Sequence, residues 1–242
     1  MKLIINGDDF GYSESCSNAI AEALRKHLIT HTTMMANGES FETAVALAKQ
    51  FHLESKVGIH FNLTEGKPLT AAITACAAFT ANGRFHKQYL RCPRQLKKAE
   101  QEAVFEELSA QAERMLAAGF AVAHADSHHY IHSFLFLAPI AAQVCRAYGI
   151  RRVRLNRTFD TAKHPRVTEG RMDNAWWREQ GFVTTAHFGR LADMAQPLLE
   201  NTEIMVHPDF DKNGVLIDRE GYADSFPEGT PLAVIKKYLS QA

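Results

Sequence analysis

The chain has 242 residues, of which 46% are hydrophobic and 22% are charged, a composition typical of a globular protein with a substantial core. Its 27 lysine and arginine residues equal its 27 aspartate and glutamate residues, so no excess positive charge favours nucleic acid or an anionic membrane surface as the main partner. No hydrophobic run approaches the roughly 20 residues of a membrane-spanning helix.

The N-terminus carries a short apolar stretch followed by acidic residues, which does not match a secretory signal. The 4 cysteines are widely spaced and form no C-x-x-C pair, a pattern typical of reduced thiols. We therefore expect a cytoplasmic protein.

Strand-like and helix-like segments alternate along the chain. Short runs of branched apolar residues predict buried parallel strands at residues 1–5, 32–35, 57–63, 121–125, 152–155, 183–186 and 203–206. Apolar residues at helical spacing predict helices at residues 13–28, 41–51, 95–118, 134–148 and 231–239. This alternation indicates an α/β fold with about seven mostly parallel strands, which could close into a barrel or stay an open sheet.

Two long connections, residues 64–94 and 156–182, interrupt the alternation. Connections of this length in a compact domain are usually functional lids or excursions. We expect one domain over residues 1–242, with these two segments covering a site and selecting its substrate.

Asp8 and Asp9 stand side by side after the first predicted strand, between Gly7 and Gly11. Two adjacent carboxylates repel each other and lose solvation when buried, so a metal ion, a basic group or phosphate chemistry would stabilise them. A turn with two solvated acids is the alternative. Adjacent residues of an ideal strand point to opposite faces, so both acids reach one site only if the chain bends, which the flanking glycines permit.

Residue types that bind metal ions follow one predicted strand after another. The carboxyl ends of parallel strands meet at one edge of a sheet, where ligands bind in α/β proteins. After the first strand, the polar residues at these ends are His60, Asn62, Asp126, His128, His129, His132, Arg154 and His207. A single buried histidine is more often a core residue, but several such strand ends together predict a shared site.

Two imidazoles and one carboxylate form a common site for a catalytic divalent metal ion. We therefore expect as ligands His60, one histidine of the 126–132 cluster and one of the two aspartates. The second aspartate could then take a proton from water at the metal ion. The ligand set suits zinc, cobalt, manganese or iron.

Four motifs occur in order along the chain: Asn6-Gly7-Asp8-Asp9-Phe10-Gly11, Gly58-Ile59-His60-Phe61-Asn62-Leu63-Thr64, Asp126-Ser127-His128-His129 and His207-Pro208. Together they resemble the YdjC-like carbohydrate deacetylases, the family of the chitooligosaccharide deacetylases. The resemblance implies a distorted (β/α) barrel that hydrolyses N-acetyl groups on amino sugars such as acetylated chitobiose. It also implies one divalent metal ion, often magnesium, and a homodimer. The chain departs from the family pattern at Tyr130, where a third histidine is frequent, and at Gly7, where alanine is common.

By position, the resemblance implies that Asp9, His60 and His128 bind the metal ion. It implies Asp8 as the base and His207 as the general acid.

Supporting roles are expected for further residues at the same strand ends. Arg154 either pairs with Asp8 and keeps it ionised or forms a surface salt bridge. Asp126 and His132 are expected to orient the ligand imidazoles, although the spacing of His132 from His128 would also allow it to bind the metal ion. Asn62 is expected to support the site or contact the substrate.

The two long connections carry aromatic and basic residues that could recognise a sugar. The candidate aromatic platforms are Phe79, Phe85, Tyr89, Trp176 and Trp177. Lys67, Arg84 or Arg157 could contact a phosphorylated sugar, although such residues also simply confer solubility.

Three other functions share parts of this pattern. A phosphoacceptor receiver domain also has paired acids after its first strand, but it needs an aspartate where this chain has His60, and the chain is about twice as long as such a domain. Another metal-dependent barrel hydrolase, such as a phosphoesterase, could use the same ligands. A sugar-binding protein without catalysis is the third alternative, which the complete set of acid, histidine and arginine residues argues against.

Overall fold

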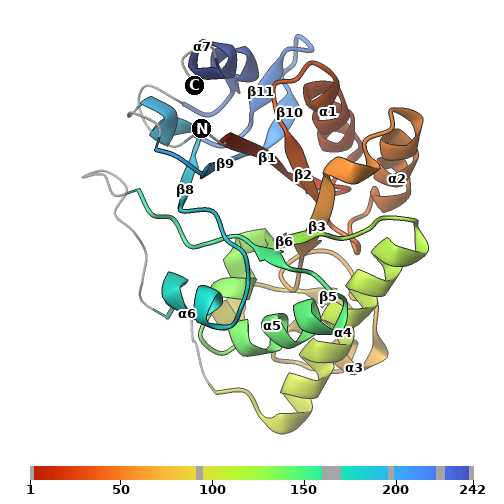
Figure 1. Cartoon of the computed structure of the whole chain (residues 1–242). Coiled ribbons are helices and arrows are strands. Elements are labelled where there is room, and N and C mark those ends of the chain that lie inside the picture. The colour runs from red at the N-terminus through yellow and green to blue at the C-terminus, as the bar shows by residue number, and fades with distance from the viewer. Residues whose placement is uncertain (1–2, 91–94, 160–169, 196–198, 222–226, 240–242) are drawn as a thin grey trace.

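The computed structural model describes residues 3–90, 95–159, 170–195, 199–221 and 227–239. Its centre is a seven-stranded sheet with the order β7-β6-β3-β2-β1-β9-β8, in which all neighbouring strands are parallel. The strands are β1 (Leu3–Phe10), β2 (His31–Met34), β3 (Val57–Phe61), β6 (His124–Ser127), β7 (Arg152–Val153), β8 (His187–Arg190) and β9 (Thr202–Val206). Helices lie outside these strands (Figure 1).

The sheet curls until its two edges approach each other. Arg152 of β7 forms an isolated parallel bridge with Val183, which shortly precedes β8. Farther along, the backbone N–H of Thr158 donates to the carbonyl of Phe188 in β8 at 2.9 Å. The predicted α/β fold with seven parallel strands is therefore confirmed, and its form is a distorted, partly closed barrel.

The principal helices follow the strands as expected. They are α1 (Glu14–Arg25), α2 (Phe41–Gln50), α4 (Lys98–Ala117) and α5 (Ala138–Ala147). Ser13 caps α1, because its hydroxyl accepts a hydrogen bond from the backbone N–H of Cys16 at 3.2 Å. The last predicted helix is shorter than expected, with α7 (Ile235–Leu239) following a 3₁₀ turn at Leu232–Val234. None of the helices in the described ranges has the length and apolar content needed to span a bilayer.

Two predicted strands are displaced along the chain. The strand expected at 121–125 is β6 at His124–Ser127, because the backbone pairs Ala125 with Ile59 of β3. The strand expected at 183–186 is β8 at His187–Arg190, which pairs with β9. In both places the apolar run precedes the paired segment.

The long connections contain short elements of their own. The first includes α3 (Ala71–Thr74) and a hairpin of β4 (Thr80–Ala81) and β5 (Arg84–Phe85). The second includes α6 (Asn174–Glu179), and its residues 160–169 lie outside the described part of the chain. A small antiparallel sheet that was not predicted follows β9, formed by β10 (Pro208–Phe210), β11 (Leu216–Asp218) and β12 (Thr230–Pro231).

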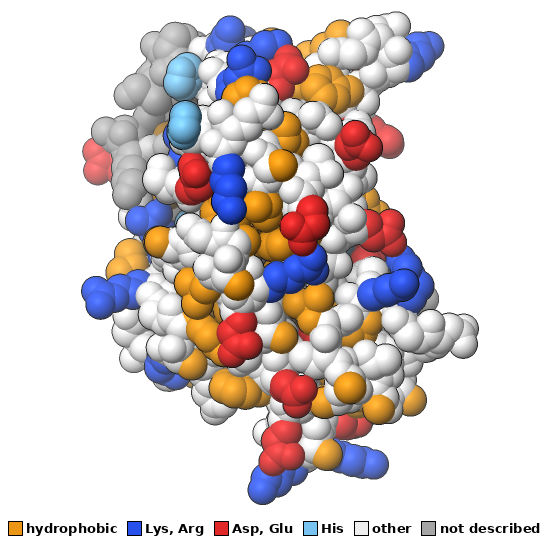
Figure 2. All heavy atoms as spheres, turned by 90° about the vertical axis from the view of Figure 1, so that its right-hand side faces the viewer, with side chains coloured by type: hydrophobic (Ala, Val, Ile, Leu, Met, Phe, Trp, Pro, Cys, Tyr) orange, Lys and Arg blue, Asp and Glu red, His pale blue; other side chains and the backbone are white. Residues whose placement is uncertain are grey.

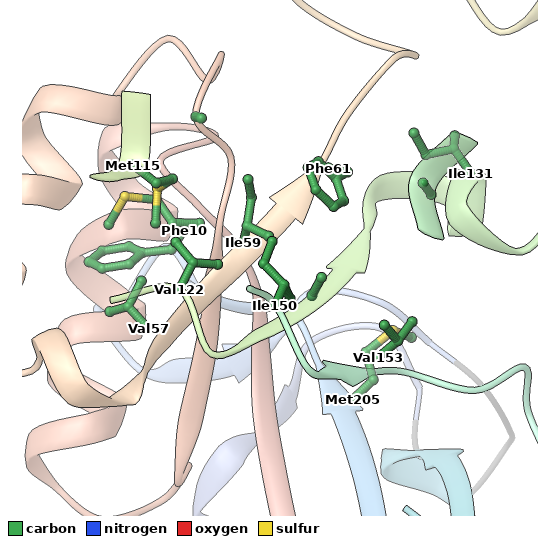
Figure 3. Close-up of a cluster of buried hydrophobic side chains, with 14 of the residues drawn as sticks. Phe10, Val57, Ile59, Phe61, Met115, Val122, Ile131, Ile150, Val153 and Met205 are labelled. Atoms are coloured by element: carbon green, nitrogen blue, oxygen red, sulfur yellow. The ribbon is translucent and has the colours of Figure 1, made fainter. Parts of the chain in front are cut away.

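Buried apolar side chains fill the space between the sheet and the helices. Phe10, Val57, Ile59 and Met115 belong to this core, and each is no more than 2% exposed (Figure 3). Because side chains alternate along a strand, His60 points away from its neighbours Ile59 and Phe61, toward the inside of the curled sheet. The polar residues of the strand ends therefore collect on that inner side.

The surface shown in Figure 2 carries basic and acidic side chains interspersed with apolar ones. No extended field of one charge sign is visible on this face. The view agrees with the balanced composition of the chain.

Candidate metal centre

Asp9, His60 and His128 form a buried three-residue cluster at the carboxyl ends of β1, β3 and β6. The Oδ1 atom of Asp9 lies 3.0 Å from Nε2 of His60 and 2.8 Å from Nδ1 of His128. The side chain of Asp9 is fully buried, and those of the two histidines are at most one-tenth exposed. The structure thus brings together the three residues expected to bind a metal ion.

The backbone bends at Asp9, which allows two adjacent acidic side chains to reach the same site. Asp9 has a φ of 72°, in the left-handed region, and the pairing of β1 with β2 shifts register between Gly7 and Phe10. The bend therefore lies at Asp9 itself, and Gly11 continues it with a φ of 91°. A non-glycine residue in this region costs about 1–3 kcal/mol, at the lower end for aspartate. The bend places Asp8 and Asp9 around the same imidazole, that of His60.

Asp8 forms a buried, two-pronged ion pair with Arg154. Nη1 of Arg154 lies 2.6 Å from Oδ2 of Asp8, and Nη2 lies 2.7 Å from Oδ1. The alternative of a surface salt bridge is wrong, because both side chains are only 2–3% exposed. Burial alone would raise the pKa of Asp8, but Arg154 lowers it below its ordinary value of 3.8. Asp8 is therefore a carboxylate at neutral pH.

Arg154 also joins Asp8 to the cluster of Asp9, His60 and His128 through Asp126. The Nη2 atom of Arg154 lies 2.6 Å from Oδ2 of Asp126, whose Oδ1 lies 2.6 Å from Nδ1 of His60. The Nε atom of Arg154 donates to Glu203 at 2.6 Å. Asp126 thus fixes the His60 ring with Nε2 toward Asp9, as expected for a carboxylate that orients a ligand imidazole. Burial lowers the pKa of His60, but Asp126 and Asp9 outweigh it and raise this pKa to about 10.

His207 lies at the end of β9, directly before the small antiparallel sheet. Its backbone N–H donates to Oδ1 of Asp218 at 3.0 Å, and its Nδ1 lies 3.6 Å from Oε2 of Glu220. The side chain is near enough to Asp8 to lower the pKa of that acid. This position is compatible with proton transfer at the same strand edge.

The ring nitrogens of His132 contact Ser127 and Arg154, and its expected role in orienting the ligand imidazoles stays a prediction. Its Nδ1 contacts the Ser127 hydroxyl, and its Nε2 lies 3.1 Å from the carbonyl oxygen of Arg154. It belongs to none of the clusters of metal-binding side chains found in the described residues. Burial lowers the pKa of His132 to about 3, so the ring is neutral and supports the backbone that carries Arg154.

Asn62 organises the chain that follows β3. Its Oδ1 accepts hydrogen bonds from the backbone and hydroxyl of Thr64, each at 2.9 Å, and its Nδ2 donates to the carbonyl of Glu65 at 2.7 Å. Asn62 is fully buried, which is typical of a supporting residue.

A pocket of about 510 Å³ lies beside the cluster. Tyr12 and Glu65 line it where it meets His128, whose ring centroid is 6.0 Å from that of Tyr12. Phe85 and Lys87, from the first long connection, also line it. Trp176 is not among the lining residues; its ring packs edge-on against Trp177, with centroids 5.0 Å apart.

The three basic candidates differ in their surroundings. Arg84 lines the pocket and pairs with Glu39 at 2.7 Å. Arg157 pairs with Asp193 at 2.5 Å, and Lys67 is not among the residues that line the pocket.

Two charged residues of the site were not predicted. Arg219, which follows β11, contacts Oδ2 of Asp9 and lies 5.0 Å above the Tyr12 ring. Glu65 lies 3.5 Å from Nε2 of His128. Glu65 directly follows the second of the four motifs, residues 58–64, so its position in the sequence offered a signal, whereas nothing near Arg219 did.

The chemistry of the donor set fits a divalent metal ion. It combines two imidazole nitrogens with one buried carboxylate, and their ligand atoms lie within 4.8 Å of one another. Burial would raise the pKa of Asp9, but His128 and His60 lower it well below 3.8, so the carboxylate is ionised. A second group, formed by Glu65, His128 and His129, meets the same distance limit.

Lys87 makes that second group a poorer metal site. Its Nζ lies 2.5 Å from Oε1 of Glu65 and 3.2 Å from Nε2 of His129. An ammonium group in this position already balances the charge of Glu65. The cluster around Asp9 is therefore the better candidate.

Comparisons with known proteins agree with this arrangement. The family model described as YdjC-like protein matches residues 2–231. The carbohydrate deacetylase of Brevibacillus brevis is 36% identical over 223 residues, which cover 89% of this chain and 84% of that protein. The carbohydrate deacetylase of Listeria welshimeri is 31% identical over 214 residues, covering 87% and 82%.

A solved structure from Enterococcus faecalis V583 shows the same fold. That protein, provisionally described as a cellobiose-phosphate cleavage protein, is 24% identical and superimposes with a TM-score of 0.68. The match covers 87% of this chain and 82% of that chain.

Proposed function

The chain belongs to the YdjC-like family, and from this premise we propose that it is a metal-dependent carbohydrate deacetylase. The reaction is hydrolysis of an N-acetyl group on an amino sugar or chitooligosaccharide, with release of acetate. The observation that carries the proposal is the buried Asp9, His60 and His128 cluster beside the ion pair of Asp8 with Arg154.

Asp9, His60 and His128 would hold the metal ion. Such an ion lowers the pKa of bound water toward about 7 and polarises a carbonyl group. The protein orients this set through Asp126, which fixes His60. We propose Mg²⁺ or Zn²⁺ as the ion, with Co²⁺ and Mn²⁺ as alternatives that elemental analysis of the purified protein distinguishes.

Asp8 and His207 would move the protons of the reaction. Asp8 takes a proton from the attacking water, whose oxygen forms the new bond to the acetyl carbon. Arg154 keeps Asp8 ionised and fixes the direction of its carboxylate. His207 donates a proton to the sugar nitrogen as the C–N bond breaks, so that an amine and acetate leave.

The pocket supports a small carbohydrate as substrate. Its volume of about 510 Å³ falls within the range of small-molecule sites. Tyr12 and Phe85 offer aromatic surfaces, and Glu65 and Lys87 offer hydrogen-bonding groups for sugar hydroxyls. We also propose a cytoplasmic homodimer without a nucleic-acid or membrane partner, and light scattering of the purified protein tests the dimer.

The direct test is acetate release from a panel of acetylated amino sugars, with and without a 6-phosphate, by protein loaded with each metal ion. We expect release from at least one sugar and its loss after chelation. Release of phosphate without acetate from the phosphorylated sugars would instead identify a phosphoesterase. Sugar binding by the metal-loaded protein without any product would identify a binding protein.

A further inference from the structure

The two histidines of the metal centre differ in how their second ring nitrogen is held. Nδ1 of His60 lies 2.6 Å from Asp126, and Nε2 faces Asp9. His128 is reversed, with Nδ1 toward Asp9 at 2.8 Å. Its Nε2 is buried and has no hydrogen-bond partner among the described residues, but Oε2 of Glu65 lies 3.5 Å away. A carboxylate therefore faces the outer nitrogen of each imidazole. The contact of Asp126 with His60 is a short hydrogen bond, whereas Glu65 lies farther from His128.

The backbone of Glu65 is fixed close to this nitrogen. Asn62 accepts a hydrogen bond from the N–H of Glu65 at 3.2 Å and donates one to its carbonyl at 2.7 Å. Asn62 itself directly follows β3, the strand that carries His60. A short lateral movement of the Glu65 side chain is thus enough to bring its carboxylate into hydrogen-bond distance of His128.

A cation holds the other oxygen of each carboxylate. Arg154 lies 2.6 Å from Asp126, and Lys87 lies 2.5 Å from Oε1 of Glu65. The order cation, carboxylate, imidazole is therefore the same on both sides of Asp9. The difference is exposure, because the Asp126 side is buried, whereas Glu65 and Lys87 are 27% and 51% exposed and line the pocket.

We propose that Glu65 is the positioning residue of His128. Its carboxylate accepts the Nε2–H of the neutral imidazole, which leaves the lone pair on Nδ1 to face the metal site. Lys87 keeps the Glu65 side chain directed toward His128. The inference rests on the proposed function only in taking His128 as a metal ligand.

Metal titration of the apo-protein tests the inference without any substrate. Glu65→Ala and Glu65→Gln are titrated with Co²⁺, and the visible absorption band of the bound ion is recorded. Carboxylates that hold a ligand imidazole typically contribute 10- to 100-fold to metal affinity. We expect a loss of about this size in Glu65→Ala and a smaller loss in Glu65→Gln, whose amide oxygen still accepts Nε2–H. Glu42→Gln is the matched control, because Glu42 is an exposed acid on α2 that pairs with Arg114 at 2.9 Å.

A spectroscopic readout separates positioning from general destabilisation. In the Co²⁺-loaded wild type, where Nδ1 faces the metal ion, ¹H NMR is expected to show the Nε2–H proton of His128 in a hydrogen bond and slow to exchange with solvent, and Glu65→Ala is expected to speed this exchange. If circular dichroism shows that Glu65→Ala does not fold, the Co²⁺ affinity of the isosteric Glu65→Gln tests the inference instead. Unchanged Co²⁺ affinity in both variants, or an unchanged exchange rate of the His128 Nε2–H proton in Glu65→Ala, would overturn the inference. Weakened Co²⁺ binding in a protein that deacetylates no sugar would leave it standing and refute only the proposed function.

Discussion

Arg154 donates hydrogen bonds to both carboxylate oxygens of Asp8, which lies 146 positions earlier in the chain. The distances are 2.6 Å from Nη1 and 2.7 Å from Nη2. The same guanidinium contacts Asp126 and Glu203. A single buried cation thus lies among three acids, of which Asp8 is the proposed base and Asp126 holds His60, a proposed metal ligand. The stability and the chemistry of the site both depend on it.

Arg154→Met is expected to lose activity and to lower the free energy of unfolding by about 3–5 kcal/mol, because buried acids lose their counter-charge. Urea denaturation and acetate release measure the two effects. Lys26→Met is the control, because Lys26 forms an exposed pair with Glu22 on α1 that contributes only about 0.2–0.5 kcal/mol. Equal stability losses in the two variants would contradict the central role of Arg154.

Asp8→Asn and Asp9→Asn are expected to have different effects. Asp9→Asn should lose most of its bound metal ion because a neutral amide replaces the ligand carboxylate. Its backbone should remain intact, since asparagine also tolerates the left-handed conformation of this residue. Asp8→Asn should retain the metal ion and lose turnover. Elemental analysis and acetate release distinguish them; a fully metal-loaded Asp9→Asn would exclude Asp9 as a ligand, and an active Asp8→Asn would exclude Asp8 as the base.

Gly7→Ala tests a close contact under the aspartate pair. A Cβ atom at Gly7 would lie 2.7 Å from Cδ1 of Ile29 and 3.3 Å from Cγ of Pro208. We expect Gly7→Ala to lower the free energy of unfolding by about 1 kcal/mol, because overpacking outweighs the entropy lost by the unfolded chain.

Ile29→Val removes the atom in closest contact. In the double variant with Gly7→Ala, chemical denaturation should therefore give a smaller loss than the sum of the two single losses. Strict additivity would show that Ile29 is not the obstacle.

Asp218→Asn is expected to stabilise the protein at neutral pH. Burial raises the pKa of Asp218 from 3.8 to about 6, so the folded state binds a proton more tightly than the unfolded state. The free energy of unfolding of the wild type therefore falls as pH rises from about 4 to about 6, by up to about 3 kcal/mol. Denaturation curves at pH 4 and pH 7 should show the gain in Asp218→Asn only at pH 7.

Asp211→Asn is the control for this pH effect. A hydrogen bond from the backbone N–H of Val215 lowers the pKa of Asp211, which is opposite in sign to the shift at Asp218, so this variant should show no gain at pH 7. A gain of similar size in both variants would contradict the role of burial at Asp218.

Tyr12→Ala is expected to raise KM for the sugar several-fold, because Tyr12 lines the pocket next to His128. Trp176→Ala should chiefly lower thermal stability, since Trp176 packs on the buried Trp177. Steady-state kinetics and thermal melting compare the two. A larger KM effect at Trp176 than at Tyr12 would restore the sugar-stacking role that the sequence suggested for Trp176.

The pattern of strand ends was informative because parallel strands end at one edge. A histidine or acid that directly follows an apolar run therefore lies at this edge of the sheet. The side chains that meet there as expected are Asp9, His60, His128 and Arg154. Their roles in catalysis stay predictions. The sequence could not reveal that Asp9 itself adopts a φ of 72°, because hydrogen bonding and packing impose that conformation.

The errors came from segments without a regular apolar pattern. The strand β6 consists of His124-Ala125-Asp126-Ser127, which is mostly polar and includes Asp126 of the site, so the preceding apolar run appeared to be the strand. Arg219 reaches Asp9 only because a three-stranded antiparallel sheet folds back toward β1. Short strands of this kind have little periodicity to detect.

The central place of β1 in the sheet determines when its strand pairing can be completed during synthesis. Its neighbours are β2, the next strand along the chain, and β9, whose first residue, Thr202, lies 199 positions after Leu3, the first residue of β1. At ribosomal rates of 5–20 residues per second, β1 waits roughly 10–40 s for its second neighbour. His207 and Arg219 emerge later still, so the strand that carries the aspartate pair is among the first parts made and among the last to be completed.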